Sequence, residues 1–214
     1  MAISGWYINF ELFFRWLHVF AGVIWVGHLY FFNFVNLQVQ PKLDAATKKV
    51  VNPLVLPRAL WWFRWGAMIT LLSGLILFTF IYMYTQGNAQ VAARWGPNAS
   101  YVADGTLTGR GIWITAGVTF ASVMWFNVWF VIWPAQQKIL RGLAGGVAVD
   151  PSVGKRAVFA SKMNTYLSAP MLFGMLGAHH YSAMNLATAV ICVAVAEGVI
   201  YLAYRGSAVA GATV

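Results

Sequence analysis

The sequence predicts an all-α integral membrane protein whose single domain, residues 1–214, is a bundle of five transmembrane helices. Composition is the first reason, because 60% of the residues are hydrophobic and only 9% are charged, against about 25% charged in an average soluble domain. Length is the second reason, because five apolar stretches approach or exceed the roughly 20 residues that cross a bilayer. Too few residues lie between these stretches to build a second domain.

The predicted spans cover residues 10–37, 60–84, 111–133, 156–180 and 185–204. Pro41, Pro53 and Pro57 are expected to break the polar connection after the first span. Pro134 is expected to stop the third span, and Pro170 to kink the fourth without ending it. The N-terminal segment lacks the basic region, apolar run and cleavage site of a signal peptide, so we expect the first span to be retained.

The distribution of basic residues orients the bundle. Of the 14 Lys and Arg residues, eleven lie in or beside the first and third connections and the tail, and only Arg15, Arg94 and Arg110 lie on the opposite side. Cytoplasmic connections carry the excess of Lys and Arg, so the N-terminus is predicted outside and the C-terminus in the cytoplasm. The net charge of +9 is then explained by topology and lipid headgroups, not by nucleic acid. Glu11 and Arg15 are expected to pair across one helical turn.

Three histidines carry the main functional hypothesis. His18 lies on the first span and His179 and His180 end the fourth, so the predicted topology puts all three in the outer third of the bilayer. Ionisable side chains in membrane helices indicate functional sites by default, and imidazoles on facing helices are suited to hold a haem b. His18 and His179 are the predicted iron ligands, with His180 as the substitute, and Gly22 leaves room for the macrocycle one turn from His18. The alternative is that the histidines are packing residues bonded to hydroxyls or carbonyls.

A second polar set is expected deeper in the bundle. His28 lies ten residues after His18, a rise of about 15 Å, and Asn127, Asn164 and Glu197 fall near its level. Three interpretations stay open: a proton path, a quinone headgroup site, or a hydrogen-bonded core. Interhelical hydrogen bonds are the ordinary role for the two asparagines, whereas a carboxylate in lipid needs a partner or its proton. His28 is the first partner that we expect for Glu197.

Other metal centres fit the sequence less well than haem. Met163, Met171, Met175 and Met184 are possible copper ligands, but methionine is ordinary packing material between helices, so copper is the weaker alternative. Cys192 is the one cysteine, which excludes an internal disulfide and a cysteine-ligated cluster. The chain has no Gly-rich phosphate loop, Ser/His/Asp order or HExxH motif, so we expect no hydrolytic site.

Three blocks of sequence resemble a known family. They are RWLHVFAGVIWVGHLYFFNFV at residues 15–35, WFNVWFVIWPAQ at 125–136 and SKMNTYLSAPMLF at 161–173, which the histidine pair follows. Together they resemble the N-terminal membrane domain of the bacterial membrane-bound, cytochrome c-linked urate oxidases. In that family a cytochrome c domain follows the membrane part. This chain has no CxxCH haem-attachment motif, so it resembles a short, stand-alone member of the family.

The resemblance implies a multi-pass protein of the bacterial inner membrane that is one component of an oxidoreductase. It carries over His18, His179 or His180, and the asparagines Asn127 and Asn164, as candidate functional residues. The first hypothesis is a haem b subunit that passes electrons between a quinol or a partner enzyme and a cytochrome c on the outer side. The second is a non-catalytic accessory subunit of a larger respiratory or oxidase complex. The third is a urate oxidase, whose anionic substrate requires an arginine, for which Arg15, Arg94 and Arg110 are the outer candidates.

Overall fold

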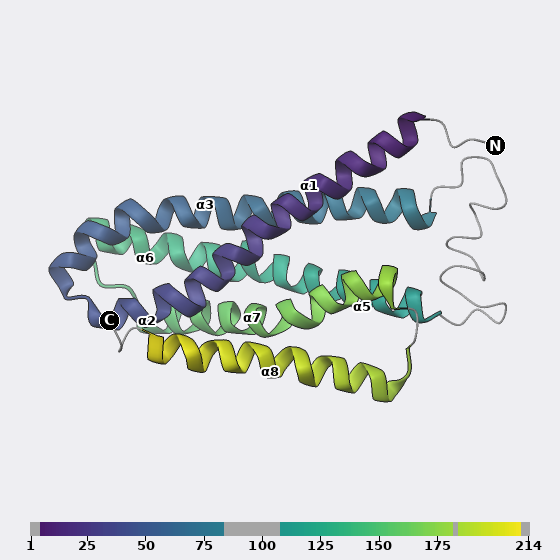
Figure 1. Cartoon of the computed structure of the whole chain (residues 1–214). Helices are drawn as coiled ribbons and strands as arrows, with labels where there is room; N and C mark the ends of the chain where they lie inside the picture. The colour runs from purple at the N-terminus through teal and green to yellow at the C-terminus, as the bar shows by residue number, and fades with distance from the viewer. Residues whose placement is uncertain (1–4, 84–107, 182–183, 211–214) are drawn as a thin grey trace.

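The computed structural model describes residues 5–83, 108–181 and 184–210, and every regular element in these ranges is helical (Figure 1). The elements in chain order are α1 (Gly5–Tyr30), η1 (Phe31–Asn36), α2 (Leu37–Val39), η2 (Gln40–Lys42), α3 (Ala45–Phe78), η3 (Thr79–Met83), α5 (Gly109–Phe126), η4 (Asn127–Ile132), α6 (Trp133–Gly145), α7 (Pro151–His180) and α8 (Leu186–Ala210). The long π-helical segments η1, η3 and η4 continue the α-helices before them. With these continuations the described chain forms five long helices: α1 with η1, α3 with η3, α5 with η4 and α6, then α7 and α8. The start of α1 and the end of α8 lie at opposite ends of the bundle (Figure 1).

The helices are longer than the predicted spans, and two proline predictions are wrong. Pro53 and Pro57 lie inside α3 and do not break it, and the helix begins upstream at Ala45. Pro134 lies in the first turn of α6, directly after the π-helical segment η4, and the helix continues through it to Gly145. Pro170 lies inside α7 without ending it, as expected.

Four helical stretches of the described chain are long and apolar enough to cross a membrane: Ile8–Lys42, Ala45–Ile81, Gly109–Gly145 and Leu186–Ala210. The fifth long helix, α7, falls outside that set because its sequence also carries Lys, Arg, Asn and His side chains. Its polar residues Asn164, Thr165 and Ser168 are fully buried. Neighbouring helices thus cover the polar side chains of α7, so this helix does not have to be apolar on every face.

Aspartates fix the start of two helices next to the apolar regions. The Asp44 carboxylate accepts hydrogen bonds from the backbone N–H and the hydroxyl of Thr47 at the start of α3. Asp150 accepts the same pair of bonds from Ser152 at the start of α7. These N-cap bonds satisfy N–H groups that the helix leaves unpaired. They also favour the ionised carboxylates, so the pKa of Asp44 and that of Asp150 lie below their usual range.

Glycines bring the helices together in two close pairs, α1 with α3 and α5 with α7. A methyl group at Gly66 of α3 would lie 3.1 Å from the backbone nitrogen of Trp25 on α1. A methyl group at Gly174 of α7 would lie 2.7 Å from the carbonyl oxygen of Trp113 and 2.8 Å from the nitrogen of Gly117, both on α5. Only a residue without Cβ permits contacts this close between helix backbones.

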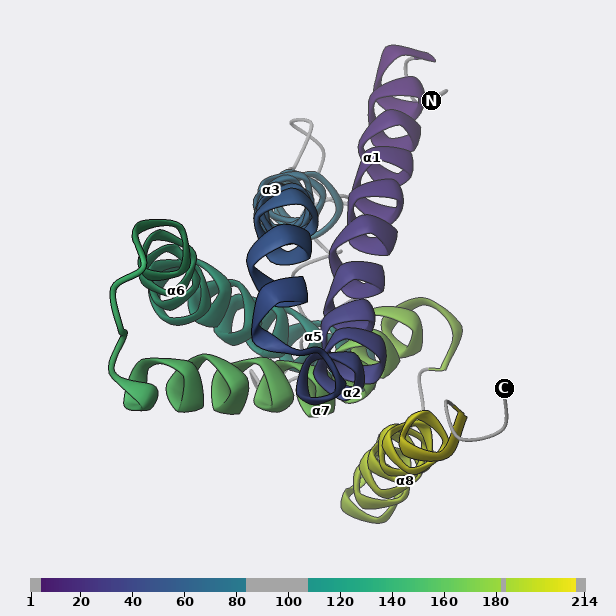
Figure 2. The same ribbon diagram turned by 90° about the vertical axis from the view of Figure 1, so that its left-hand side faces the viewer.

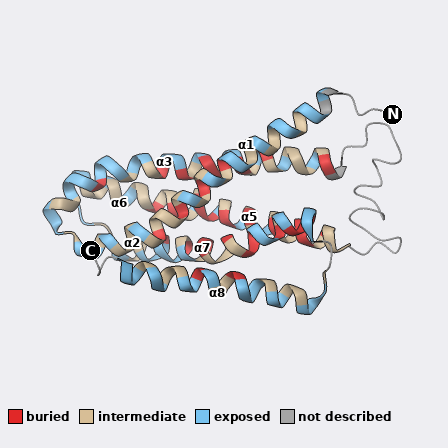
Figure 3. Ribbon diagram, viewed as in Figure 1, coloured by how far each residue is buried: buried red, intermediate tan, exposed pale blue. Residues whose placement is uncertain are grey.

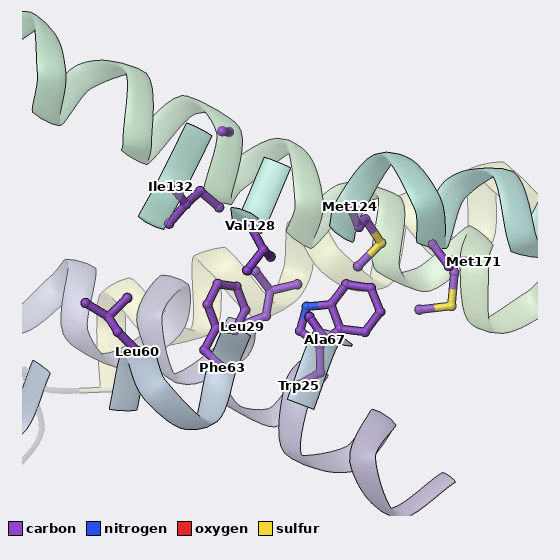
Figure 4. Close-up of a cluster of buried hydrophobic side chains, with 11 residues drawn as sticks. Trp25, Leu29, Leu60, Phe63, Ala67, Met124, Val128, Ile132 and Met171 are labelled. Carbon is purple, nitrogen blue, oxygen red and sulfur yellow. The ribbon is translucent and has the colours of Figure 1, made fainter. Parts of the chain in front are cut away.

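A buried hydrophobic cluster joins the two pairs in the inner part of the bundle (Figure 4). Trp25 and Leu29 of α1 and Phe63 of α3 meet Met124 of α5 and Val128 of η4, and each is almost fully buried. By contrast, α8 lies at the edge of the bundle beside α7 (Figure 2). Most of its surface is exposed (Figure 3), and Ala196 and Ile200 are its only buried residues.

The replacement Gly174→Ala tests the close contact of α5 with α7. We expect the free energy of unfolding to fall by about 1–3 kcal/mol, because the new methyl group pushes two backbones apart. Gly198→Ala on α8 is the matched control, since a methyl group there meets no atom within 4 Å, and alanine favours the helix. Thermal unfolding of both variants in detergent micelles measures the difference. Equal stability of the two variants would contradict the close packing.

Candidate functional site

A cavity of about 390 Å³ lies between the two helix pairs, toward the end of the bundle where α1 begins. Apolar side chains of α1, α3, η3, α5 and α7 form most of its wall. His18, His179 and His180 line this one cavity, so α1 and α7 bring the three predicted site histidines together. Its volume lies within the range of about 300–1,000 Å³ that is typical of ligand and cofactor sites.

The backbone of α3 holds the His18 ring in place. The Nδ1 atom of His18 lies 2.9 Å from the carbonyl oxygen of Thr70, and because a carbonyl only accepts, Nδ1 carries the proton. The Ser73 hydroxyl lies 3.4 Å from the same nitrogen. This bond leaves Nε2 unprotonated in the neutral ring, with a lone pair for a metal or a hydrogen-bond donor.

Gly74 makes room for the His18 ring, and it is not among the residues that the sequence predicted. A methyl group at Gly74 would lie 2.8 Å from Cε1 and 3.1 Å from Nδ1 of His18. Gly22, the predicted small residue, faces Thr70 instead, and it is not among the cavity-lining residues. The sequence contained the signal for this contact, since Gly66, Thr70 and Gly74 recur every four residues on one face of α3.

A second, more polar cavity of about 600 Å³ adjoins the first at the end of α7. The two cavities share Arg15, His179 and His180, and Glu11 and Arg110 also line the outer one. Arg15 forms the predicted ion pair with Glu11, with 2.6 Å between its Nη2 and Oε1. Among the described residues that line this outer cavity there are two arginines and one carboxylate, a balance that favours anionic groups.

Trp25 contributes an unpaired hydrogen-bond donor to the site. Its side chain is 1% exposed and lines the inner cavity, and among the described residues its Nε1 has no hydrogen-bond partner. A buried N–H without an acceptor is costly, so an acceptor atom in the cavity, whether from water or a ligand, would stabilise it. Trp25 follows His18 by two helical turns on the same face of α1, which is the signal that sequence reasoning missed.

Two of the four methionines named as copper candidates, Met171 and Met175, line the inner cavity. Met184 packs against a smaller hydrophobic cluster that includes Trp113 and Cys192. Within the part of the chain that the structure describes, no three His, Cys, Asp or Glu side chains lie so that they could together hold a metal ion.

The predicted inner polar set is divided in the structure. Asn127 Nδ2 donates to Asn164 Oδ1 at 2.8 Å, and Asn164 Nδ2 donates to the carbonyl oxygen of Met124 at 2.9 Å. The two asparagines therefore form the interhelical hydrogen bonds expected of them. His28 instead bonds through Nδ1 to the carbonyl oxygen of Ile24 in its own helix. Glu197 makes no hydrogen bond or ion pair with any residue in the described ranges.

A different asparagine, Asn33 of η1, is the centre of an inner network that the sequence analysis did not identify. Its amide donates to the Leu29 carbonyl at 2.9 Å and to the Ser161 hydroxyl of α7 at 2.8 Å. Its Oδ1 accepts the Tyr204 hydroxyl of α8 at 3.0 Å. Nearby, the Tyr30 hydroxyl bonds to Ser168 at 2.9 Å. Asn33 thus connects α1 and η1 with α7 and α8, which are far from it in the sequence.

The profile of the urate oxidase N-terminal family matches residues 89–204, more than half of the chain. The chain belongs to this family. The match includes the sequence blocks at 125–136 and 161–173 and both His179 and His180, while the block at 15–35 with His18 lies before it. No curated protein and no solved structure matches the chain. Membership of the urate oxidase N-terminal family therefore rests on α5, α6, α7 and α8.

The geometry of His18 predicts a fixed tautomer. In ¹⁵N-histidine NMR spectra of the detergent-solubilised protein near neutral pH, we expect His18 to show a protonated Nδ1 and an unprotonated Nε2, because Thr70 accepts only from Nδ1. Gly74→Ala should shift or broaden these resonances, since its methyl group collides with the ring. Gly22→Ala is the control, because its methyl group would lie at an ordinary 3.9 Å from Thr70 Cγ2. A protonated Nε2 in the unaltered protein would refute the assigned bond.

Proposed function

We propose that the chain is a membrane-embedded subunit that carries electrons through a haem b, with His18 and His179 as iron ligands and His180 as the substitute. The observation that carries this proposal is the shared cavity: three imidazoles from two helices line one mainly apolar chamber. When bound, haem supplies reversible one-electron chemistry. The residues of this chain bind it, orient it and exclude water from it.

The hydrogen bond of His18 supports a role as a metal ligand. Histidines that bind metals usually donate their second ring N–H to a carbonyl or carboxylate, which fixes the ring and makes the ligating nitrogen more basic. The bond from Nδ1 to the Thr70 carbonyl has this form. Gly74 keeps the space beside the ring clear. These two features of His18 support its role as one haem ligand, with His179 as the second imidazole of the proposed pair.

The outer cavity supports the same assignment through its charge. A haem b carries two carboxylate groups at one edge, and such groups are stabilised by arginine. Arg15 and Arg110 line the cavity that adjoins the histidine site. The apolar inner wall would contact the macrocycle, and the polar outer wall its carboxylates.

The length and hydropathy of the helices support the proposed membrane placement. Four helical stretches are long and apolar enough to cross, and we infer that α7 is the fifth span, since its buried polar residues face other helices. The basic residues at the start of α3, in α6 and at the start of α7 then face the cytoplasm of a bacterial inner membrane. The histidine cavity opens toward the outer side, where a cytochrome c or a partner enzyme would exchange electrons, and a quinol is a further donor.

A second candidate, urate oxidation, is favoured by the family name and by the arginines of the outer cavity. Urate is an anion, and Arg15 and Arg110 line a polar space of about 600 Å³. Arg94, the third predicted candidate, lies outside the described residues. Loss of urate-dependent reduction of cytochrome c in membranes of a deletion strain would support this activity, and an unchanged rate would oppose it.

Absorbance spectra test the haem. We expect the purified full chain, expressed with sufficient haem, to show Soret and α bands that change on reduction with dithionite. His18→Ala should remove these bands. Of His179→Ala and His180→Ala, the variant that loses the bands identifies the second ligand. His28→Ala is the matched control on the same helix, since His28 bonds to its own backbone and does not line the cavity. A folded protein without iron and without these bands would contradict the haem and favour the accessory subunit.

A further inference from the structure

Glu197 is an isolated carboxylate in the middle of α8. It follows Ala196, precedes Gly198 and lies within the apolar stretch Leu186–Ala210. Among the residues that the structure describes it has no hydrogen-bond or ion-pair partner, and its side chain is only half-buried. Neither the histidine cavity nor the asparagine pair includes it.

The surface of α8 is uncovered on one side of Glu197, whereas Ala196 and Ile200 on the other side are buried. One turn before it, Val193 and Ala194 are exposed, and one turn after it Tyr201 is 53% exposed. A methyl group at Gly198 would meet no atom within 4 Å. The nearest cation along the helix, Arg205, lies two turns away, with its guanidinium 5.9 Å from the centre of the Tyr201 ring. The side of α8 that carries these exposed residues is therefore accessible to another helix, and α8 itself lies at the edge of the bundle (Figure 2).

Charge decides what would cover this surface. A carboxylate at membrane depth is unfavourable unless it meets a cation, a hydrogen-bond donor or a proton. Lipid tails supply none of these. A second copy in parallel orientation would bring two Glu197 carboxylates together, and like charges at close range repel. A helix that carries a basic side chain would neutralise Glu197.

We propose that α8 is the docking surface for a transmembrane helix of a partner protein, which places a lysine, arginine or protonated histidine against the Glu197 carboxylate. The small side chains of Ala194 and Gly198 flank Glu197 and allow the two backbones to approach closely. This proposal rests on the membrane placement of α8 and is independent of the haem, whose presence the absorbance spectra decide separately.

The test uses designed transmembrane peptides as probes. The full chain, labelled at its C-terminal end with an energy-transfer donor, is reconstituted in nanodiscs with acceptor-labelled 24-residue Leu/Ala helices. These helices carry Lys, Leu or Glu at the central position. We expect the Lys helix to bind about tenfold more tightly than the Leu helix, as polar contacts between membrane helices allow. Glu197→Gln should remove most of this preference, and Glu197→Lys should transfer it to the Glu helix.

Leu202→Gln is the matched control, because Leu202 is an exposed residue on another part of α8. It should keep the preference for the Lys helix. Equal binding of the Lys and Leu helices by the unaltered chain, or no binding of either, would overturn the proposal. So would a dimer of the chain alone, seen by sedimentation, that Glu197→Gln dissociates, because the second copy would then be the occupant. Thermal unfolding of each variant shows that it is folded.

Discussion

The close packing of two helix pairs through glycine is the constraint on which the rest of the structure depends. Gly66 lets the α1 backbone contact α3, and Gly117 and Gly174 do the same for α5 and α7. Close packing within each pair leaves the remaining space between the pairs. The hydrophobic cluster around Trp25 fills its inner part, and the histidine cavity occupies its outer part. The histidine cavity is thus a consequence of glycines that bring helices together within each pair, while larger side chains keep the two pairs apart.

The polarity of α7 has the same origin. Helices on several sides cover α7, so it can carry asparagine, threonine and serine, which hydrogen-bond to neighbours instead of facing lipid. The outer end of this helix holds His179 and His180, and its middle holds Asn164. The covered face of α7 thus carries polar side chains into the interior of the bundle, whereas Phe159 and Leu176 elsewhere on the helix are exposed.

The sequence predicted the all-helical fold and the meeting of His18 with the histidine pair, because length, hydropathy and depth along a helix can be counted. The prediction that Gly22 lies beside His18 was wrong, because the rotation of one helix against another depends on side-chain packing, which residue spacing along the sequence does not reveal. Gly74 and not Gly22 makes that contact.

The prediction that Pro53 and Pro57 break the chain before α3 was wrong because it left out exposure. Most of the helix around these prolines is exposed, so the backbone groups that they leave unpaired can reach water. The Asn33 network was missed because an asparagine without a charge or a motif gives no signal until its neighbours are known.

The two adjoining cavities differ in chemistry, because the inner one is mainly apolar and the outer one is more polar. The inner cavity is mainly apolar, so charge that develops there is poorly solvated and strongly affected by the few polar groups present. Its polar groups are the histidines, Arg15, the indole of Trp25, whose Nε1 has no partner among the described residues, and the hydroxyl and carbonyl groups of α3 that hold His18. The outer cavity brings Arg15 to the same histidines, where its charge acts on the site across a short distance. Since Glu11 pairs with Arg15, loss of that carboxylate would expose the site to the full arginine charge, which stabilises the more electron-rich state of any bound group. With the haem that we propose bound at this site, the ion pair at the start of α1 would therefore help to set its electron affinity, besides joining two side chains at the surface.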